Sequence, residues 1–544
     1  MDISQDIKDL ARLKQIISVL TKSGFASQLA STQLKTHLPL LSRFAPTPLT
    51  PKDQAKNLKT AFIELGPTFV KLGQLLSVRP DLVPEEYCEE FKSLQDNVPP
   101  FPFEQVQQII EAELKSPLSK IFKSFTKVPL ASASIAQVHR AVLRDGTLVA
   151  VKVQRPNIEG IINTDLDILL TIAHQLESHI EKIKPYRPVE IAKEFALWTR
   201  RELNFTREAA SAIHLQNILK DVPKVRTPKM YLEYTTKRVL TMEYIDGKRL
   251  DDQSNFKTHS RHDIIMRYFT SILTQALGGG FFHADPHPAN IFIDKRGNLI
   301  FLDFGIMGEL NEEDRIKIIS FITSINGANT NHSINIIISL ARNTTHADLE
   351  QFKDESLPLL RDAYVHTIAE NSAGKILYQI LKLGAQHGLI FDPNHILMAK
   401  AMYQTEGIAI KLDPSFKIAS GLSTFADTYL KKMYSPRKIL ERATKKLTDN
   451  RELLLELPDH IIKIMNRLEH QNDNQITRQE LLEHDDKLYH NLKQSMMIAL
   501  ILILGFAASI MIYLGGTTQI LSIPLTYLFL AIALIILIWY TVRN

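Results

Sequence analysis

The chain contains few of the residues that several common kinds of site require. It has one cysteine among 544 residues, Cys88, which excludes an internal disulfide and a cysteine-rich zinc or iron–sulfur site. Glycine is scarce, at 21 residues, against roughly 7% of an average protein, so a glycine-rich phosphate loop cannot be assumed. The net charge is +5 with no long run of lysine or arginine, which predicts no nucleic-acid partner. The 45% of hydrophobic residues and 23% of charged residues predict a folded chain with a large core.

Two apolar segments near the C-terminus contain no charged residue. Residues 496–514 and 521–540 are each about as long as a helix that crosses a hydrocarbon core of roughly 30 Å. The short uncharged segment 515–520 between them predicts a transmembrane helical hairpin. Lys493 before it and Arg543 after it predict that both ends face the cytoplasm. The alternative is a buried helical pair in a soluble core.

The hydrophobic pattern divides the rest of the chain into helical and β-rich parts. Apolar runs on either side of Asp145-Gly146 and of the turn 295–298 predict two β-hairpins. A small β-containing lobe followed by a larger helical lobe indicates a two-lobed α+β nucleotide-binding fold. The predicted parts are an N-terminal helical segment at 1–50, a helical extension at 51–127, the small lobe with a prominent helix at 128–245, the large helical lobe at 246–435, and an amphipathic charged helical linker at 436–490.

Four residues in a fixed order indicate phosphoryl transfer from a nucleotide. Lys152 ends an apolar strand pattern, and a lysine there can hold the α- and β-phosphates of ATP. Asp285 and Asn290 have the spacing of a kinase catalytic loop, in which the aspartate orients or deprotonates the attacking hydroxyl and the asparagine binds Mg²⁺. Asp303, in Asp-Phe-Gly, would bind Mg²⁺ that bridges the β- and γ-phosphates. Taken singly, these are a solvated lysine, a polar turn and a chance tripeptide, but the ordered set predicts ATP and Mg²⁺.

The segment before Lys152 contains no G-x-G-x-x-G motif. The residues assigned to the nucleotide-binding loop in its place are Ala131, Ser132, Ala133, Ser134, Ile135 and Ala136. Their side chains prevent the close backbone approach that glycine allows, so the nucleotide should bind differently from the way it binds an ordinary protein kinase. Two glutamates complete the nucleotide-binding set. Glu202 is predicted to pair with Lys152, with a solvated side chain as the alternative, and Glu243 is the last residue but one of the strand predicted over 238–244.

A second unusual segment precedes the small lobe. Periodicity over residues 66–81 predicts a helix that places Lys71 and Gln74 one turn apart on one face. Gly73 between them destabilises a helix by about 1 kcal/mol relative to alanine, which predicts close packing at that position. From spacing alone, the simpler explanation for Lys71 is a solvated side chain.

Together these residues resemble the UbiB family of atypical kinase-like proteins, known in animals as the ADCK family. The match extends from about residue 55 to about residue 310, and the C-terminal hairpin resembles that of the bacterial members. The family's K-x-G-Q motif corresponds to Lys71–Gln74, and its E-x-D glutamate to Glu202, while Glu208 also fits this group. The chain departs from the family at Asn204, where E-x-D has aspartate, and at Ala289, where a glycine is usual.

The resemblance implies a protein kinase-like fold whose K-x-G-Q helices lie over the cleft where a peptide would otherwise bind. It also implies MgATP binding, weak ATPase activity, a role in ubiquinone biosynthesis and a place in the bacterial inner membrane. The implied partners are membrane lipid, polyprenyl-phenol precursors of ubiquinone and ubiquinone-biosynthesis enzymes, with a homodimer left open. Two alternatives are a catalytically silent scaffold and a small-molecule kinase of the aminoglycoside or choline type.

Overall fold

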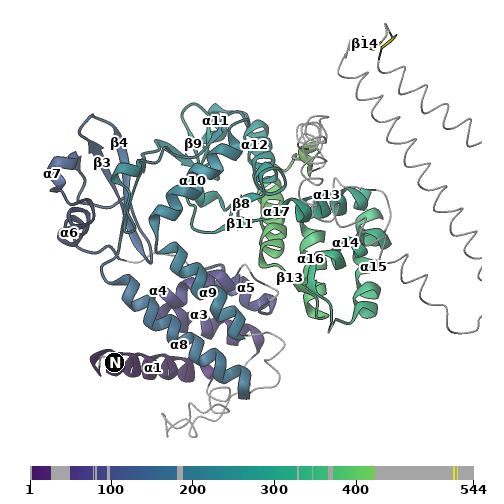
Figure 1. Ribbon diagram of the computed structural model, residues 1–544, viewed down its shortest axis with the longest axis horizontal. Helices are drawn as coiled ribbons and strands as arrows, with labels where there is room; N and C mark the ends of the chain where they lie inside the picture. The colour runs from purple at the N-terminus through teal and green to yellow at the C-terminus, as the bar shows by residue number, and fades with distance from the viewer. Residues whose placement is uncertain are drawn as a thin grey trace, which may run out of the picture. The chain divides into compact units, whose positions relative to one another are not determined.

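The chain forms two compact units, Met1–Lys438 and Ile439–Asn544. The computed structural model describes residues 3–25, 50–77, 79, 82–94, 99–179, 188–326, 330–345, 347–365, 372–418, 420–422, 425, 519–520 and 523–524 (Figure 1). The described residues of the second unit form two short antiparallel strands, β14 (Gln519–Ile520) and β15 (Ile523–Pro524).

The predicted linker and almost all of the predicted hairpin lie outside the described residues. Among the helices that the structure describes, none combines the length and apolar character that crossing a bilayer requires.

The small lobe is an antiparallel sheet in the order β1-β3-β4-β6, with β2 added at β3. The predicted turn at Asp145-Gly146 joins β3 to β4, and Gly146 has a φ of 89°, a conformation that favours glycine. The strand predicted over 238–244 is also present, as β6. The bounds are β1 (Phe122–Phe125), β2 (Ala131–Ser132), β3 (Ala136–Leu143), β4 (Leu148–Gln154) and β6 (Val239–Glu243).

Alternation along β4 decides where Lys152 points. Val149, Val151 and Val153 are fully buried in one cluster with residues of helix α6 (Phe103–Leu114). Ala150 belongs to a different cluster, which includes helix α10 (Phe205–Leu219). Because successive side chains of a strand point to opposite faces, Lys152 shares the face of Ala150 and points toward α10.

The large lobe carries short strands at the position of the predicted catalytic segment. The predicted hairpin at 295–298 joins β9 to β10, which pair antiparallel, and Gly297 has a φ of 75°. Strand β8 pairs with β11, so the segments before Asp285 and after Asp303 lie side by side. The bounds are β5 (Val225–Arg226), β7 (Gly247–Arg249), β8 (Phe281–His283), β9 (Ile291–Asp294), β10 (Leu299–Phe301) and β11 (Met307–Glu309).

The remaining elements are mainly helices. Those of the N-terminal extension are α1 (Ile3–Leu20), η1 (Thr21–Phe25), α3 (Pro51–Leu65), α4 (Pro67–Ser77) and α5 (Glu85–Phe91). Around the small lobe lie α7 (Leu118–Ile121), α8 (Ile158–His179), α9 (Pro188–Glu202) and η5 (Leu232–Tyr234). The large lobe contains α11 (Asn255–Thr258), α12 (Arg261–Leu273), η6 (Thr274–Gly279), η7 (Pro288–Asn290), α13 (Glu312–Asn326), α14 (Thr330–Leu340), α15 (Leu349–Val365), α16 (Ala373–Gln386) and α17 (Pro393–Leu412).

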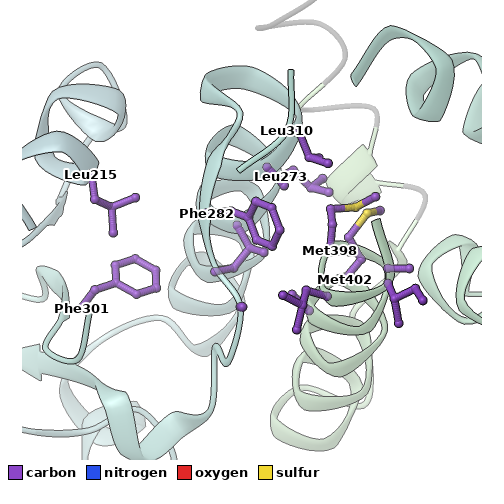
Figure 2. Packing of buried hydrophobic residues seen from close by; sticks show 14 of the residues in the cluster. Leu215, Leu273, Phe282, Phe301, Leu310, Met398 and Met402 are labelled. Atoms are coloured by element: carbon purple, nitrogen blue, oxygen red, sulfur yellow. The ribbon is translucent and has the colours of Figure 1, made fainter. Parts of the chain in front are cut away.

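The core of the large lobe holds the catalytic segment against helix α17. Figure 2 shows Phe282 of β8 packed among apolar side chains, with Met398 and Met402 of α17 beside it. Phe282 is fully buried, and a side chain at Gly308 on the paired strand would collide with its ring. Burying a side chain of this size contributes roughly 1.5–3 kcal/mol, so the strand that leads into Asp285 is firmly anchored.

Two helical expectations need correction. The extension predicted as helical over 51–127 ends in strand β1, and the lobe predicted as helical over 246–435 contains, after the predicted hairpin, a short pair, β12 (Ala341–Asn343) with β13 (Ile390–Phe391). Both differences have the same cause, because strands of two to four residues carry too little alternation to be told from helical segments by periodicity.

Candidate functional site

Lys152 forms an ion pair with Glu208 of helix α10. Its Nζ lies 2.8 Å and 2.9 Å from the two carboxylate oxygens. Burial alone would lower the pKa of Lys152, but Glu208 and Asp303 outweigh it and hold the pKa above its usual value. Lys152 therefore carries a permanent positive charge in the cleft. The predicted partner, Glu202, is wrong for this pair.

Glu202 pairs instead with Lys71 of the K-x-G-Q helix, α4. Glu202 ends α9 and Glu208 lies in the first turn of α10, with a break between the two helices. Because the chain changes direction between α9 and α10, the side chains of Glu202 and Glu208 point to different places. Each glutamate therefore pairs with a different lysine, although only six residues separate them. Lys71 is buried rather than solvated, which also corrects the simpler explanation from spacing.

Helix α4 is tightly packed at its glycine, as predicted. A Cβ on Gly73 would collide with Leu94 and would lie 2.9 Å from Cδ2 of Phe62. Gln74 donates a hydrogen bond from Nε2 to the carbonyl oxygen of Leu94, at 3.3 Å. A side chain at this position would have to push Leu94 and Phe62 aside, so glycine lets α4 lie close to α3 and the segment after α5, which positions Lys71 and Gln74.

The catalytic loop that follows β8 is held by its own backbone and by neighbouring side chains. His283 accepts a hydrogen bond at Nδ1 from the amide of Asp285, at 3.1 Å. Burial lowers the pKa of His283, and the neutral ring is the form that can accept this bond. Asn290 donates to the carbonyl oxygen of Asp285 at 3.4 Å, and Tyr268 of α12 donates to that of Pro286 at 2.8 Å. The loop thus brings Asp285 and Asn290 together, as their spacing predicts.

Asp303 is the acid on which the two lysines converge. Burial would raise the pKa of Asp303, but Lys152, the amide of Gly305 and Lys71 together hold it below its usual value. The Gly305 amide donates to Oδ1 of Asp303 at 3.0 Å. The carboxylate is therefore ionised and oriented, which is the state that metal binding needs.

The alanine-rich loop joins β2 to β3 in the small lobe. Ala131 and Ser132 form β2, and the amide of Ala133 donates to the carbonyl oxygen of Ala136 at 2.8 Å. Ile135 and Ala136 are buried in the core, and a nucleotide contact by this loop stays a prediction. Ser132 accepts a hydrogen bond from Arg155 at 2.9 Å, whereas the buried hydroxyl of Ser134 has no hydrogen-bond partner in the described residues. Of the two serines, Ser134 is the one with a polar atom left for a ligand.

Comparison with known proteins agrees with this geometry. Residues 93–336 match the ABC1 atypical kinase-like domain, and residues 359–417 match the UbiB helical domain. A probable protein kinase UbiB of Marinobacter nauticus is 31% identical over 461 residues, which are 82% of this chain and 84% of that protein. The chain belongs to the UbiB family. The resemblance inferred from the motifs is confirmed, and the fold is the kinase-like mixed α/β fold.

Other relatives of this UbiB-family chain cover it less evenly. The chloroplastic protein ACTIVITY OF BC1 COMPLEX KINASE 3 of Arabidopsis thaliana is 34% identical over 418 residues, which are 76% of this chain but 57% of that protein. An uncharacterized protein, sll0095, of Synechocystis is 34% identical over 381 residues, which are 68% of this chain and 67% of that protein.

The departure of this UbiB-family chain at Asn204 has a simple structural explanation. Asn204 is the N-cap of α10, and its Oδ1 accepts hydrogen bonds from the amide and the hydroxyl of Thr206, at 3.1 Å and 2.7 Å. Asparagine and aspartate are about equally good N-caps, so the change keeps the start of the helix that carries Glu208.

Glu243 has a structural partner. Its carboxylate accepts hydrogen bonds from both terminal nitrogens of Arg226, at 2.7 Å and 2.9 Å, and one from the amide of Lys229. Burial opposes ionisation, but Arg226 holds the pKa of Glu243 below its usual value. The carboxylate thus ties β6 to β5, and a nucleotide contact by Glu243 stays a prediction.

Sequence reasoning missed two polar side chains of α17. Gln404 donates from Nε2 to Oδ1 of Asp285 at 3.2 Å, and Lys400, one turn earlier, donates to the carbonyl oxygen of Ser77 at 2.9 Å. Both lie in the UbiB helical domain, 115 or more residues after Asp285 in the sequence. No local motif connects them to the loop, and the only signal is their spacing of four on a helix that is otherwise largely buried.

The residues present suit Mg²⁺ only together with a nucleotide. In the described part of the chain, no three His, Cys, Asp or Glu side chains lie close enough to hold a metal ion by themselves. Mg²⁺ is commonly held by one or two protein ligands plus substrate phosphates. Asp303 and Asn290 meet that requirement, with Lys152 available for the phosphates.

Proposed function

We propose that this protein is a membrane-anchored ATPase of the atypical kinase class that supports ubiquinone biosynthesis. The observation that carries the proposal is the loop that brings Asp285 and Asn290 together, with Lys152 held in the cleft by Glu208 and its charge lowering the pKa of Asp303 against burial. Family membership supports kinase-type chemistry in general, and the motifs support ATP as the phosphoryl donor.

Each residue has a defined part in this proposal. Lys152 binds the phosphates of ATP, and its pairing with Glu208 fixes the direction of the ammonium group. Asp303 and Asn290 hold Mg²⁺, which neutralises negative charge on the phosphates when it is bound. Asp285 orients the attacking water or hydroxyl and accepts its proton, while ADP leaves with the bridging oxygen.

The position of the K-x-G-Q helix limits the acceptor. A small cavity of about 80 Å³ is lined by Lys71 and Gln74 of α4, Trp198 of α9 and Gly305 beyond Asp303, together with neighbouring residues. Helix α4 therefore occupies the side of the cleft where a peptide would have to lie. Water or the head of a small phenol is the acceptor that this cavity suits, which supports polyprenyl-phenol precursors as partners.

The membrane part of the proposal rests on the two uncharged segments at 496–514 and 521–540. A hairpin there would hold the kinase-like unit at the cytoplasmic face of the bacterial inner membrane, where polyprenyl intermediates reside. Membrane lipid and the biosynthetic enzymes are the further partners that this location implies.

ADP release by the purified full chain tests the proposal. The rate would be measured with MgATP, with and without anionic vesicles and a soluble ubiquinone-precursor phenol. We expect Asp303→Asn to reduce turnover to background because a Mg²⁺ ligand is lost, while Asp354→Asn, an exposed change on α15, retains full activity.

Retained activity in Asp303→Asn would refute the assignment of the site. Nucleotide binding without turnover above that variant would instead favour a scaffold that binds lipid intermediates and biosynthetic enzymes.

A further inference from the structure

The catalytic loop lacks a positively charged side chain of its own. Between Asp285 and Asn290 the sequence is Pro-His-Pro-Ala, so His287 is the single titratable residue there. Nδ1 of His287 accepts a hydrogen bond from the amide of Ala289 at 3.2 Å, which ties the ring to the loop. Phosphoryl transfer places negative charge on the transferred group, and a cation near the acceptor side stabilises it. That cation must come from another element.

Helix α17 reaches the loop from the large lobe. Asn394 at the start of α17 accepts a hydrogen bond from the amide of Glu309 in β11 at 3.1 Å. Helix α17 also packs against α12 (Figure 1). Further along the helix, Gln404 donates to Asp285 at 3.2 Å. Residues four apart on a helix lie on one face, so Lys400 projects beside Gln404 toward the same region.

Lys400 makes one hydrogen bond, from Nζ to the carbonyl oxygen of Ser77 at the end of α4, at 2.9 Å. An ammonium group has three donors, and in the described part of the chain the other two have no hydrogen-bond partner. Burial lowers the pKa of Lys400 to about 8, with the charge of Asp285 as the main opposing influence. Lys400 thus stands one helical turn from Gln404, the residue that donates to Asp285, and it has two donors without a hydrogen-bond partner in the described residues.

We propose that Gln404 and Lys400 complete the catalytic site from the UbiB helical domain. Gln404 is a positioning residue that holds Oδ1 of Asp285, and Lys400 supplies the positive charge for the transferred phosphoryl group that the loop lacks. The inference rests on the proposed ATPase function. The plain alternative is that Lys400 only binds the free carbonyl groups at the C-terminus of α4.

Binding of a transition-state mimic separates these two roles. The full chain and its variants would be titrated with MgADP alone and with MgADP plus aluminium fluoride, which imitates the transferred phosphoryl group. For Lys400→Gln we expect the affinity for MgADP alone to stay within about twofold of wild type. The factor by which aluminium fluoride increases MgADP affinity should fall about tenfold or more, because a charged hydrogen bond is removed. Lys400→Arg keeps the charge and should restore most of that increase. Lys411→Gln, an exposed change on the same helix, should alter neither value.

The outcomes are distinct. If aluminium fluoride increases MgADP affinity as much in Lys400→Gln as in wild type, Lys400 does not stabilise the transferred group and only its contact with α4 remains. An equal loss of affinity for MgADP alone and for MgADP with aluminium fluoride also overturns the proposed role. Failure of the wild-type chain to bind MgADP refutes the ATPase function itself, and this inference with it.

Gln404 is tested independently, which keeps the proposal falsifiable if Lys400→Gln does not fold. Gln404→Met preserves size but removes the donor to Asp285. We expect kcat to fall about tenfold with KM for MgATP unchanged, because Asp285 acts on the acceptor and not on ATP binding. An unchanged kcat, or a matching rise in KM, would contradict the positioning role.

Discussion

Two lysine–glutamate ion pairs approach Asp303 from different parts of the molecule. Lys152 and Glu208 join a strand of the small lobe to α10, and Glu208 is only 6% exposed. Lys71 and Glu202 join the K-x-G-Q helix to the end of α9, and Glu202 is 24% exposed. Both lysines lower the pKa of Asp303. The first pair lies within the kinase-like lobe, whereas the second depends on the packing of α4 against α9.

Replacing each glutamate in turn is the strongest test of whether the two ion pairs differ in their contributions to stability and MgATP binding. Glu208→Gln leaves the buried ammonium of Lys152 without its counter-charge, so we expect a loss of about 3–5 kcal/mol in the free energy of unfolding and at least about tenfold weaker MgATP binding. Glu202→Gln should destabilise by about 1 kcal/mol and leave MgATP affinity within about twofold, because this pair is partly solvated. Denaturant unfolding and titration with a fluorescent ATP analogue measure both quantities. Equal effects of the two changes would show that the pairs are not distinct.

A substitution that disturbs only the packing of α4 tests whether this helix affects stability without affecting MgATP binding. In Gly73→Ala the new methyl group collides with Leu94 and Phe62, which should destabilise the chain by about 1–3 kcal/mol without changing MgATP affinity. Gly160→Ala is the matched control, because a Cβ there meets nothing within 4 Å, and it should stabilise α8 by about 0.5–1 kcal/mol. Thermal melting with and without MgATP provides the test. A Gly73→Ala chain as stable as wild type would contradict the close packing of α4.

Glu406 of α17 shows what a buried glutamate does without a lysine. It accepts hydrogen bonds from Ser372 and from the amide of Gly374, and no ion pair involves it in the described residues. Burial raises its pKa to about 8, against about 4.5 when unfolded. The folded state therefore holds a proton that the unfolded state has released, and stability falls as pH rises from about 4.5 to about 8.

We expect a fall of at least about 2 °C in melting temperature across this range, and a smaller fall in Glu406→Gln, whose side chain stays neutral. Differential scanning fluorimetry between pH 5 and 9 measures both. Identical pH profiles for the two chains would show that Glu406 does not carry the effect.

Much of the site could be predicted from short-range sequence. The turn glycines at 146 and 297, the spacing of Asp285 and Asn290, and the placement of Lys152 on a strand all follow from local conformational preferences, and the structure contains each of them. The close packing at Gly73 was also predictable, because glycine inside a helix is unfavourable unless something needs the space.

The pairing of charges could not be predicted in this way. Choosing between Glu202 and Glu208 requires the phase of two helices across the break at Asn204, and hydrophobic periodicity does not locate such a break to the residue. No local sequence motif predicts the contact of Gln404 with Asp285, because the contact forms only when α17 packs against the catalytic segment.

The sequence by itself determined which chemistry-bearing residues the chain has, the strands and turns that present them, and the family to which it belongs. These depend on local backbone preferences and on side-chain types in a fixed order. Only the tertiary structure decided which glutamate neutralises which lysine and that α17 contributes to the loop at Asp285. Electrostatic and hydrogen-bond partners are chosen by distance in space, and for partners 56 or more residues apart that distance is set by packing of the whole core rather than by any local segment.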